Sequence, residues 1–183
     1  MAQDVPRGFT SVVGINGKSI VFYVDHHNRI KRYGQNPKED REEMASKRNQ
    51  YDDVQMKDPS NGAGEIITST KELAAIYFKR DNEFHLRLYY VDASNKVVEL
   101  AQDLDAADPT KVKRDWYVGD MTKKGYEARP QTSSTAHVNE YEKSASIKVY
   151  FFPKDARRTD RPTVAWYDVS KDGKWQILDE GGI

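Results

Sequence analysis

The chain has 183 residues, 37% of them hydrophobic, and it carries 29 basic and 29 acidic side chains, so its formal net charge is zero. A neutral chain lacks the positive surface of most nucleic-acid and anionic-membrane binders, and the absence of cysteine excludes a disulfide scaffold and a thiolate metal site. Residues 1–7 lack the apolar core of a signal peptide and no apolar run approaches the ~18 residues of a membrane span, so we expect a soluble protein, cytoplasmic or secreted without a visible signal.

The first predicted unit consists of four short strands joined by turns. An apolar run at residues 10–15 leads through the Asn-Gly pair at 16–17 into a second strand at residues 20–25. Asn-Gly is a strong hairpin signal because both positions tolerate positive φ. A third strand is expected at residues 29–33, and Tyr51 opens a fourth segment.

The same order of strands returns twice, and an aromatic residue opens the last segment of each copy. The second copy occupies residues 73–77, 84–92 and 96–101, followed by Trp116. The third occupies residues 133–138, 147–152 and 163–168, followed by Trp175. Such self-similarity indicates a repeat architecture, and we predict an all-β fold, a β-propeller with three four-stranded blades. The blades of this single domain are expected at about residues 8–60, 70–122 and 130–180, and the alternative is a closed β-barrel or sandwich.

Two polar insertions lengthen these units beyond an ordinary blade. Residues 37–50 contain helix formers but almost no apolar stripe, which predicts a solvated loop or a short surface helix. Residues 103–114 are the second insertion.

Three blades are too few to close a propeller, which usually has about 4–8. An open arc leaves strand edges and blade flanks that favour association. We therefore expect a homodimer in which two copies complete a ring of six blades.

One of the three copies carries a distinctive polar pair. Residues 85–92 are followed by residues 95–99, with Arg87 in the first segment and Glu99 at the end of the second. This pattern resembles the blade motif of the fungal fucose-specific lectins, the family of the orange-peel mushroom lectin. The resemblance implies a six-bladed propeller with sugar sites between adjacent blades. It also implies that Arg87 and Glu99 hydrogen-bond the sugar while aromatic side chains cover its apolar face.

The other two copies depart from this motif. In the first, Ile20 stands at the arginine position and Arg32 at the glutamate position. In the third, Lys148 replaces the arginine, and Trp166 or a neighbour replaces the glutamate. Lysine lacks the planar fork of guanidinium and is no equivalent substitute. The predicted carbohydrate-binding residues are Arg87, Glu99, Trp116, Tyr51 and Trp175.

These features favour a non-catalytic, fucose-type lectin of fungus-like source, with fucosylated glycans or glycoproteins as partners and no nucleic acid or membrane insertion. The alternative is a propeller-like protein-interaction or effector module with degenerate sugar sites. In the simplest interpretation of the motif, Arg87 and Glu99 lie on adjacent strands and form a surface ion pair worth ~0–1 kcal/mol. If Arg87 and Glu99 face an open inter-blade groove near an aromatic residue, the lectin is favoured, and if the pair is buried or mutually saturated, the module is favoured. A hydrolase on the same scaffold would need two converging carboxylates, which no motif nominates.

We expect neither catalytic residues nor a cofactor or metal. His26 and His27 are adjacent at a predicted hairpin tip, where their side chains point in different directions and make a poor metal site.

Overall fold

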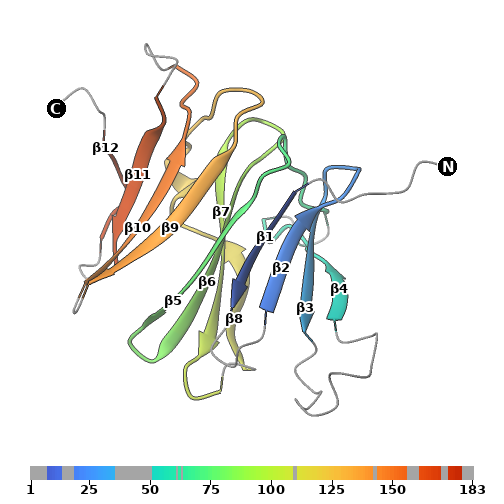
Figure 1. The fold of residues 1–183 in the computed structure, drawn as a ribbon, viewed down its shortest axis with the longest axis vertical. Coiled ribbons are helices and arrows are strands. Elements are labelled where there is room, and N and C mark those ends of the chain that lie inside the picture. The colour runs from blue at the N-terminus through green and yellow to red at the C-terminus, as the bar shows by residue number, and fades with distance from the viewer. Residues whose placement is uncertain are drawn as a thin grey trace.

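The computed structural model describes residues 8–13, 19–35, 51–60, 62, 64–108, 111–141, 144–155, 161–169 and 173–178. These residues form an all-β fold in which twelve strands make three separate four-stranded antiparallel sheets (Figure 1). The second sheet lies between the first and the third, and each sheet is one blade of a β-propeller.

Within each sheet the strands are hydrogen-bonded in chain order. The first sheet contains β1 (Gly8–Val13), β2 (Ser19–Val24), β3 (Ile30–Gln35) and β4 (Tyr51–Gln55). The second contains β5 (Ala74–Arg80), β6 (Glu83–Val91), β7 (Val97–Asp105) and β8 (Val112–Val118), followed by the short 3-10 helix η2 (Thr122–Lys124). The third contains β9 (Ser134–Tyr141), β10 (Ser144–Phe151), β11 (Thr163–Asp168) and β12 (Gln176–Leu178). Strand β5 contacts β1 on one side and β9 on the other, so the first strand of each sheet lies nearest the other sheets.

A repeated turn joins the second and third strands of the first two sheets. The carboxylate of Asp25 accepts hydrogen bonds from the backbone N–H groups two and four residues later, at 2.9 and 3.0 Å. Asp92 does the same at 2.8 Å for both. Asn28 and Asn95, three residues after each aspartate, take positive φ angles of 61° and 63°. Asparagine tolerates this backbone region and aspartate can cap a turn, which explains why both residue types recur.

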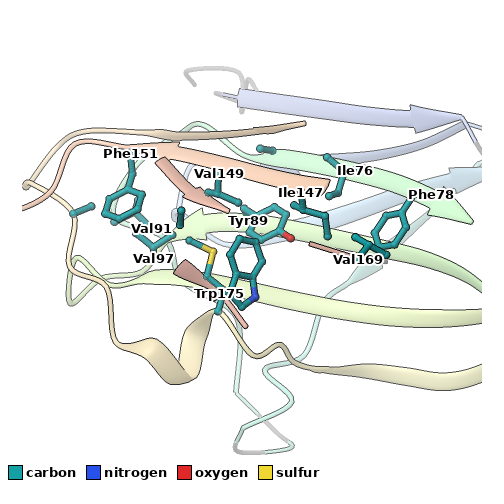
Figure 2. Packing of buried hydrophobic residues seen from close by; sticks show 14 residues of the cluster. Ile76, Phe78, Tyr89, Val91, Val97, Ile147, Val149, Phe151, Val169 and Trp175 are labelled. Atoms are coloured by element: carbon teal, nitrogen blue, oxygen red, sulfur yellow. The ribbon is translucent and has the colours of Figure 1, made fainter. Parts of the chain in front are cut away.

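Strands β6 and β7 of the second sheet are largely buried on both faces, because a sheet lies against each face. Side chains along β6 alternate between the two faces, as strand geometry requires. Leu86 and Leu88 belong to the core shared with the first sheet, while Tyr89 and Val91 belong to the core shared with the third. Figure 2 shows the second of these cores, to which the third sheet contributes Trp175. Each fully buried side chain of this size contributes about 1.5–3 kcal/mol.

The predicted all-β propeller architecture is confirmed, and the barrel and sandwich alternatives are wrong because the three sheets remain separate. The prediction of an insertion at residues 103–114 is wrong at both ends of that segment, where residues 103–105 end β7 and residues 112–114 begin β8. The predicted loop or surface helix at residues 37–50 lies outside the described residues. In the part of the chain that the structure describes, no helix has the length and apolar character needed to cross a membrane.

Candidate functional site

Strands β6 and β7 place Arg87 and Glu99 on the face of the second sheet that packs against the third. The register pairs Tyr89 with Glu99 and Arg87 with Ala101, so the two charged side chains are diagonal neighbours. Arg87 Nε lies 3.7 Å from Glu99 Oε1. The side chains are only 12% and 5% exposed, so this is a buried pair and not the surface ion pair of the simplest interpretation.

A cavity of about 70 Å³ lies over this pair, at the boundary between the second and third sheets. Tyr167 of β11 and Trp175, which directly precedes β12, lie close together on the opposite wall, with ring centroids 5.5 Å apart. Trp175 also meets Tyr89 edge-on at 6.2 Å, and Figure 2 shows these two rings side by side. A single buried water needs ~10–15 Å³, so the cavity has room for several hydroxyl-sized groups. Its lining residues are Arg87, Glu99, Ala101, Tyr117, Gly119, Asp120, Ile147, Tyr167 and Trp175.

The Glu99 carboxylate is held by two hydrogen bonds from its own sheet and the segment after it. Oε1 accepts from the Tyr89 hydroxyl at 3.0 Å, and Oε2 accepts from the Met121 backbone N–H at 2.9 Å. Burial raises the pKa of Glu99, and the Met121 N–H and the Arg87 charge partly offset that rise. A carboxylate oxygen has two lone pairs, so each oxygen retains acceptor capacity for a ligand hydroxyl.

The Arg87 guanidinium is anchored mainly through one nitrogen. Nη1 donates to Asp103 Oδ1 at 3.0 Å and also contacts the backbone oxygens of Leu86 and Gln102, at 3.0 and 3.3 Å. Nη2 lies 3.3 Å from His85 Nδ1, and the 3.7 Å from Nε to Glu99 exceeds an ordinary hydrogen bond. Guanidinium has five N–H donors, so the Nη2 and Nε side is not saturated.

Asp103 holds this anchor in place. Its carboxylate accepts from Arg87, and it accepts from the Tyr117 hydroxyl at 2.7 Å. His85 Nδ1 lies 2.7 Å away. Burial alone would raise the pKa of Asp103, but the His85 hydrogen bond and the Arg87 charge hold that pKa well below its usual range. Burial raises the pKa of Tyr117 to about 12, so its hydroxyl remains a donor at neutral pH.

The lowered pKa makes the contribution of Asp103 to stability depend on pH. A group with a depressed folded-state pKa stabilises the fold above its unfolded pKa and loses that contribution as the pH falls through the folded pKa. Asp103→Asn is expected to cost about 3 kcal/mol near pH 7, because it leaves Arg87 without its closest charged partner. Urea denaturation of both proteins should show that difference shrinking below about pH 4. A difference that stays constant down to about pH 3 would contradict this account of the Asp103 carboxylate.

The predicted site residues do not all meet. Arg87, Glu99 and Trp175 line the same cavity. Trp116 lies elsewhere, in edge-on contact with Phe22 at 5.8 Å between the first and second sheets. Tyr51 begins β4, and its side chain lies outside the described residues.

Six of the nine lining residues, and the residue that supports Arg87, were not predicted from the sequence. Tyr117, Gly119 and Tyr167 line the cavity, and Asp103 supports Arg87 from behind. The period-2 alternation of a strand could have indicated Asp103, because it lies two residues beyond Ala101, the register partner of Arg87. No comparable signal exists for Tyr167, which the third sheet supplies.

The other two copies lack the charged pair at the corresponding register positions. In the first sheet, Phe22 pairs with Arg32 at the register position where Tyr89 pairs with Glu99 in the second sheet, so arginine stands at the glutamate position. In the third sheet, Tyr150 pairs with Val164, so valine stands at the glutamate position. The prediction that Trp166 or a neighbour occupies that position is therefore wrong by two residues. Trp166 instead pairs with Lys148, as Ala101 pairs with Arg87.

Among the described residues, one group has metal-ligating side chains close together: Glu83, His85 and Asp103. Its carboxylates already have cationic partners. Lys113 Nζ lies 3.3 Å from Glu83, and Arg87 lies 3.0 Å from Asp103. A metal ion at this position would have to compete with both cations.

The three four-stranded sheets, packed face against face, define the fold class as a β-propeller. The chain superposes on a mutant of the Aleuria aurantia lectin in complex with Fucα1-6GlcNAc with a TM-score of 0.56 and 17% identity, covering 93% of this chain and 47% of that chain. The same mutant lectin with α-methyl-L-fucoside gives a TM-score of 0.55 with the same identity and coverage. The SapL1 lectin in complex with α-methyl fucoside gives 0.48 at 17% identity, covering 94% of this chain and 47% of that one. No protein-family model and no curated protein sequence matches the chain. The chain thus shares the fold of these lectins and spans about half their length.

Proposed function

We propose that the chain is a non-catalytic carbohydrate-binding protein that recognises fucose-type glycans in the cavity between its second and third sheets. The observation that carries this proposal is the convergence of Arg87, Glu99 and the Tyr167–Trp175 pair on one inter-blade cavity. Guanidinium supplies hydrogen-bond donors, and a carboxylate accepts from hydroxyls. Aromatic rings cover the C–H face of a sugar and its methyl group.

The burial and hydrogen bonding of the Arg87–Glu99 pair bear on both the lectin and the interaction-module interpretation. The pair is buried and bonded, as the interaction-module interpretation expects, but neither partner has used all of its donors or acceptors. A site fixed by its own hydrogen bonds loses less freedom on binding, which favours recognition of a small rigid ring. The lectins that share this fold are described in complex with fucose-containing ligands, which supports the same ligand class.

Calorimetric titration with L-fucose tests the proposal directly. We expect one site per chain with a dissociation constant on the order of 0.1–1 mM, as a monosaccharide with a few hydrogen bonds allows. L-Galactose differs from L-fucose by one hydroxyl on the exocyclic carbon, so it should bind more weakly if that methyl group packs on the aromatic wall. D-Fucose, the mirror image, is the negative control. A folded sample that does not bind L-fucose at millimolar concentration would sink the proposal.

A second candidate is a protein-interaction or effector module that has kept the propeller blades but no longer binds a sugar. The observation in its favour is the loss of the charged pair from the first and third sheets, where Arg32 and Val164 stand at the glutamate position. A glycan array separates the two candidates. Signals restricted to fucosylated glycans support the lectin, and a blank array with a folded sample supports the module.

A further inference from the structure

The three sheets stack in one direction, so each has a forward face toward the next sheet and a backward face toward the previous one. On β6, Leu86 and Leu88 point backward into the core with the first sheet. Tyr89 and Val91 point forward into the core with the third. Both described sheet interfaces therefore join a forward face to a backward face.

The arrangement leaves the backward face of the first sheet and the forward face of the third without a neighbouring sheet within the described residues. The backward face of the first sheet carries Phe9 and Val13, which are 78% and 65% exposed. Both alternate along β1 with Val12, which points into the core with the second sheet. Large apolar side chains exposed on one sheet face indicate an interaction surface.

The forward face of the third sheet is also rich in rings. Lys148 and Tyr150 alternate along β10 with Ile147 and Val149, which point backward into the core. The ring of His137 stacks on Tyr150 with centroids 5.3 Å apart. The forward face of the third sheet corresponds to the forward face of the second sheet, which carries Arg87 and Tyr89. In the second sheet, this forward face is covered by the third sheet.

We infer that a second copy of this chain covers both faces, with the third sheet of each copy packing on the first sheet of the other. One face is forward and the other backward, so the new interface between the two copies, here called the seam, repeats the kind of packing already present twice within the chain. A two-fold arrangement forms two such seams and closes a ring with no open flank. The Aleuria aurantia lectin is about twice as long as this chain, and the three-sheet unit matches about half of it. Two copies of this chain therefore have about the length of that one lectin chain.

The seam differs chemically from the proposed sugar site. Lys148 and Val164 stand where that site has Arg87 and Glu99, so the seam carries no second charged pair. The dimer then holds two sugar sites, each built within one chain. Failure of sugar binding would leave the dimer inference untouched, and a monomer could still bind fucose.

Light scattering on a size-exclusion column measures the assembly of the 183-residue chain. We expect twice the chain mass of 21.0 kDa at micromolar concentration. Phe9→Arg should raise the dimer dissociation constant on the order of 100-fold, because it places a charge in the seam. The fold should persist because Phe9 is exposed within the chain. Val112→Arg, at a position 46% exposed on β8, should leave the dimer intact.

Cross-linking identifies which faces meet, and the absence of native cysteine makes introduced thiols unique. Chains carrying Val13→Cys are mixed with chains carrying His137→Cys and treated with a short thiol-specific cross-linker. We expect covalent dimers in the mixture and none in either variant alone, since the seam joins unlike faces. A monomeric wild type, a higher oligomer, or cross-linking within Val13→Cys alone would overturn the inference.

Discussion

Replacing Arg87 by alanine is expected to lower fucose affinity by on the order of 100-fold or more, because charge-assisted hydrogen bonds contribute about 1.5–3 kcal/mol each. The change removes the cation that lies between Asp103 and Glu99, at 3.0 and 3.7 Å. Those two carboxylates would then face each other without compensation, which costs about 3–5 kcal/mol of stability. Calorimetry measures the affinity, and urea denaturation measures the stability.

A second variant keeps the test decisive if Arg87→Ala unfolds. Arg87→Lys preserves the charge but not the planar fork, so it should fold and bind fucose at least about 10-fold more weakly. Arg29→Ala is the matched control, because Arg29 also bridges two carboxylates, Asp25 at 2.7 Å and Glu65 at 3.0 Å, but does not line the cavity. If a folded Arg87→Lys variant bound fucose with wild-type affinity, the sugar would not depend on the guanidinium group of Arg87.

The repeat and its turns could be predicted because they are local. Asp25 with Asn28 and Asp92 with Asn95 encode the same capped turn, and that turn fixes the register of the two strands it joins. Once the register of β6 and β7 is fixed, Arg87 and Glu99 must share a face, since strand side chains alternate with period 2.

The aromatic residue that β8 contributes to the cavity could not be predicted in the same way. Trp116 and Tyr117 are adjacent on β8, so they point to opposite faces, and their assignment depends on the pairing of β7 with β8. That pairing contains register shifts on both sides of Asp103, and a one-residue shift exchanges the two faces. Tyr117 pairs with Ala101 and lines the cavity, while Trp116 packs against Phe22. No residue pattern in a single strand reports such a bulge.

The cavity residues that come from the third sheet and its connecting segment were still harder to predict from the sequence. Trp175 was predicted as a binding residue because an aromatic follows the third strand of each unit, and not from any indication that it lies opposite Arg87; Tyr167 was not predicted as a binding residue. Their place opposite Arg87 depends on how two sheets pack, which follows from the whole buried face and not from a local motif.

The second large effect is expected at Gly119, which lies beside the Glu99 side chain. An added Cβ at this position would overlap the Glu99 carboxylate. The carboxylate cannot move aside freely, because it accepts from Tyr89 at 3.0 Å and from the Met121 N–H at 2.9 Å. Gly119→Ala is therefore expected to push Glu99 off both donors. Leaving buried donors unsatisfied costs about 1–3 kcal/mol each, so we expect a loss of about 2–4 kcal/mol of stability.

The same displacement should abolish fucose binding, because Glu99 supplies the acceptor of the proposed site. Gly125→Ala provides the matched control. Gly125 has a φ of 67° and no atom within 4 Å of an added Cβ, so alanine there meets only backbone strain of about 1–2 kcal/mol. This control should bind fucose as the wild type does. If Gly119→Ala loses stability but retains affinity, Glu99 supports the fold alone, and the acceptor for the sugar must be sought among the other residues that line the cavity, with Asp120 the first to replace.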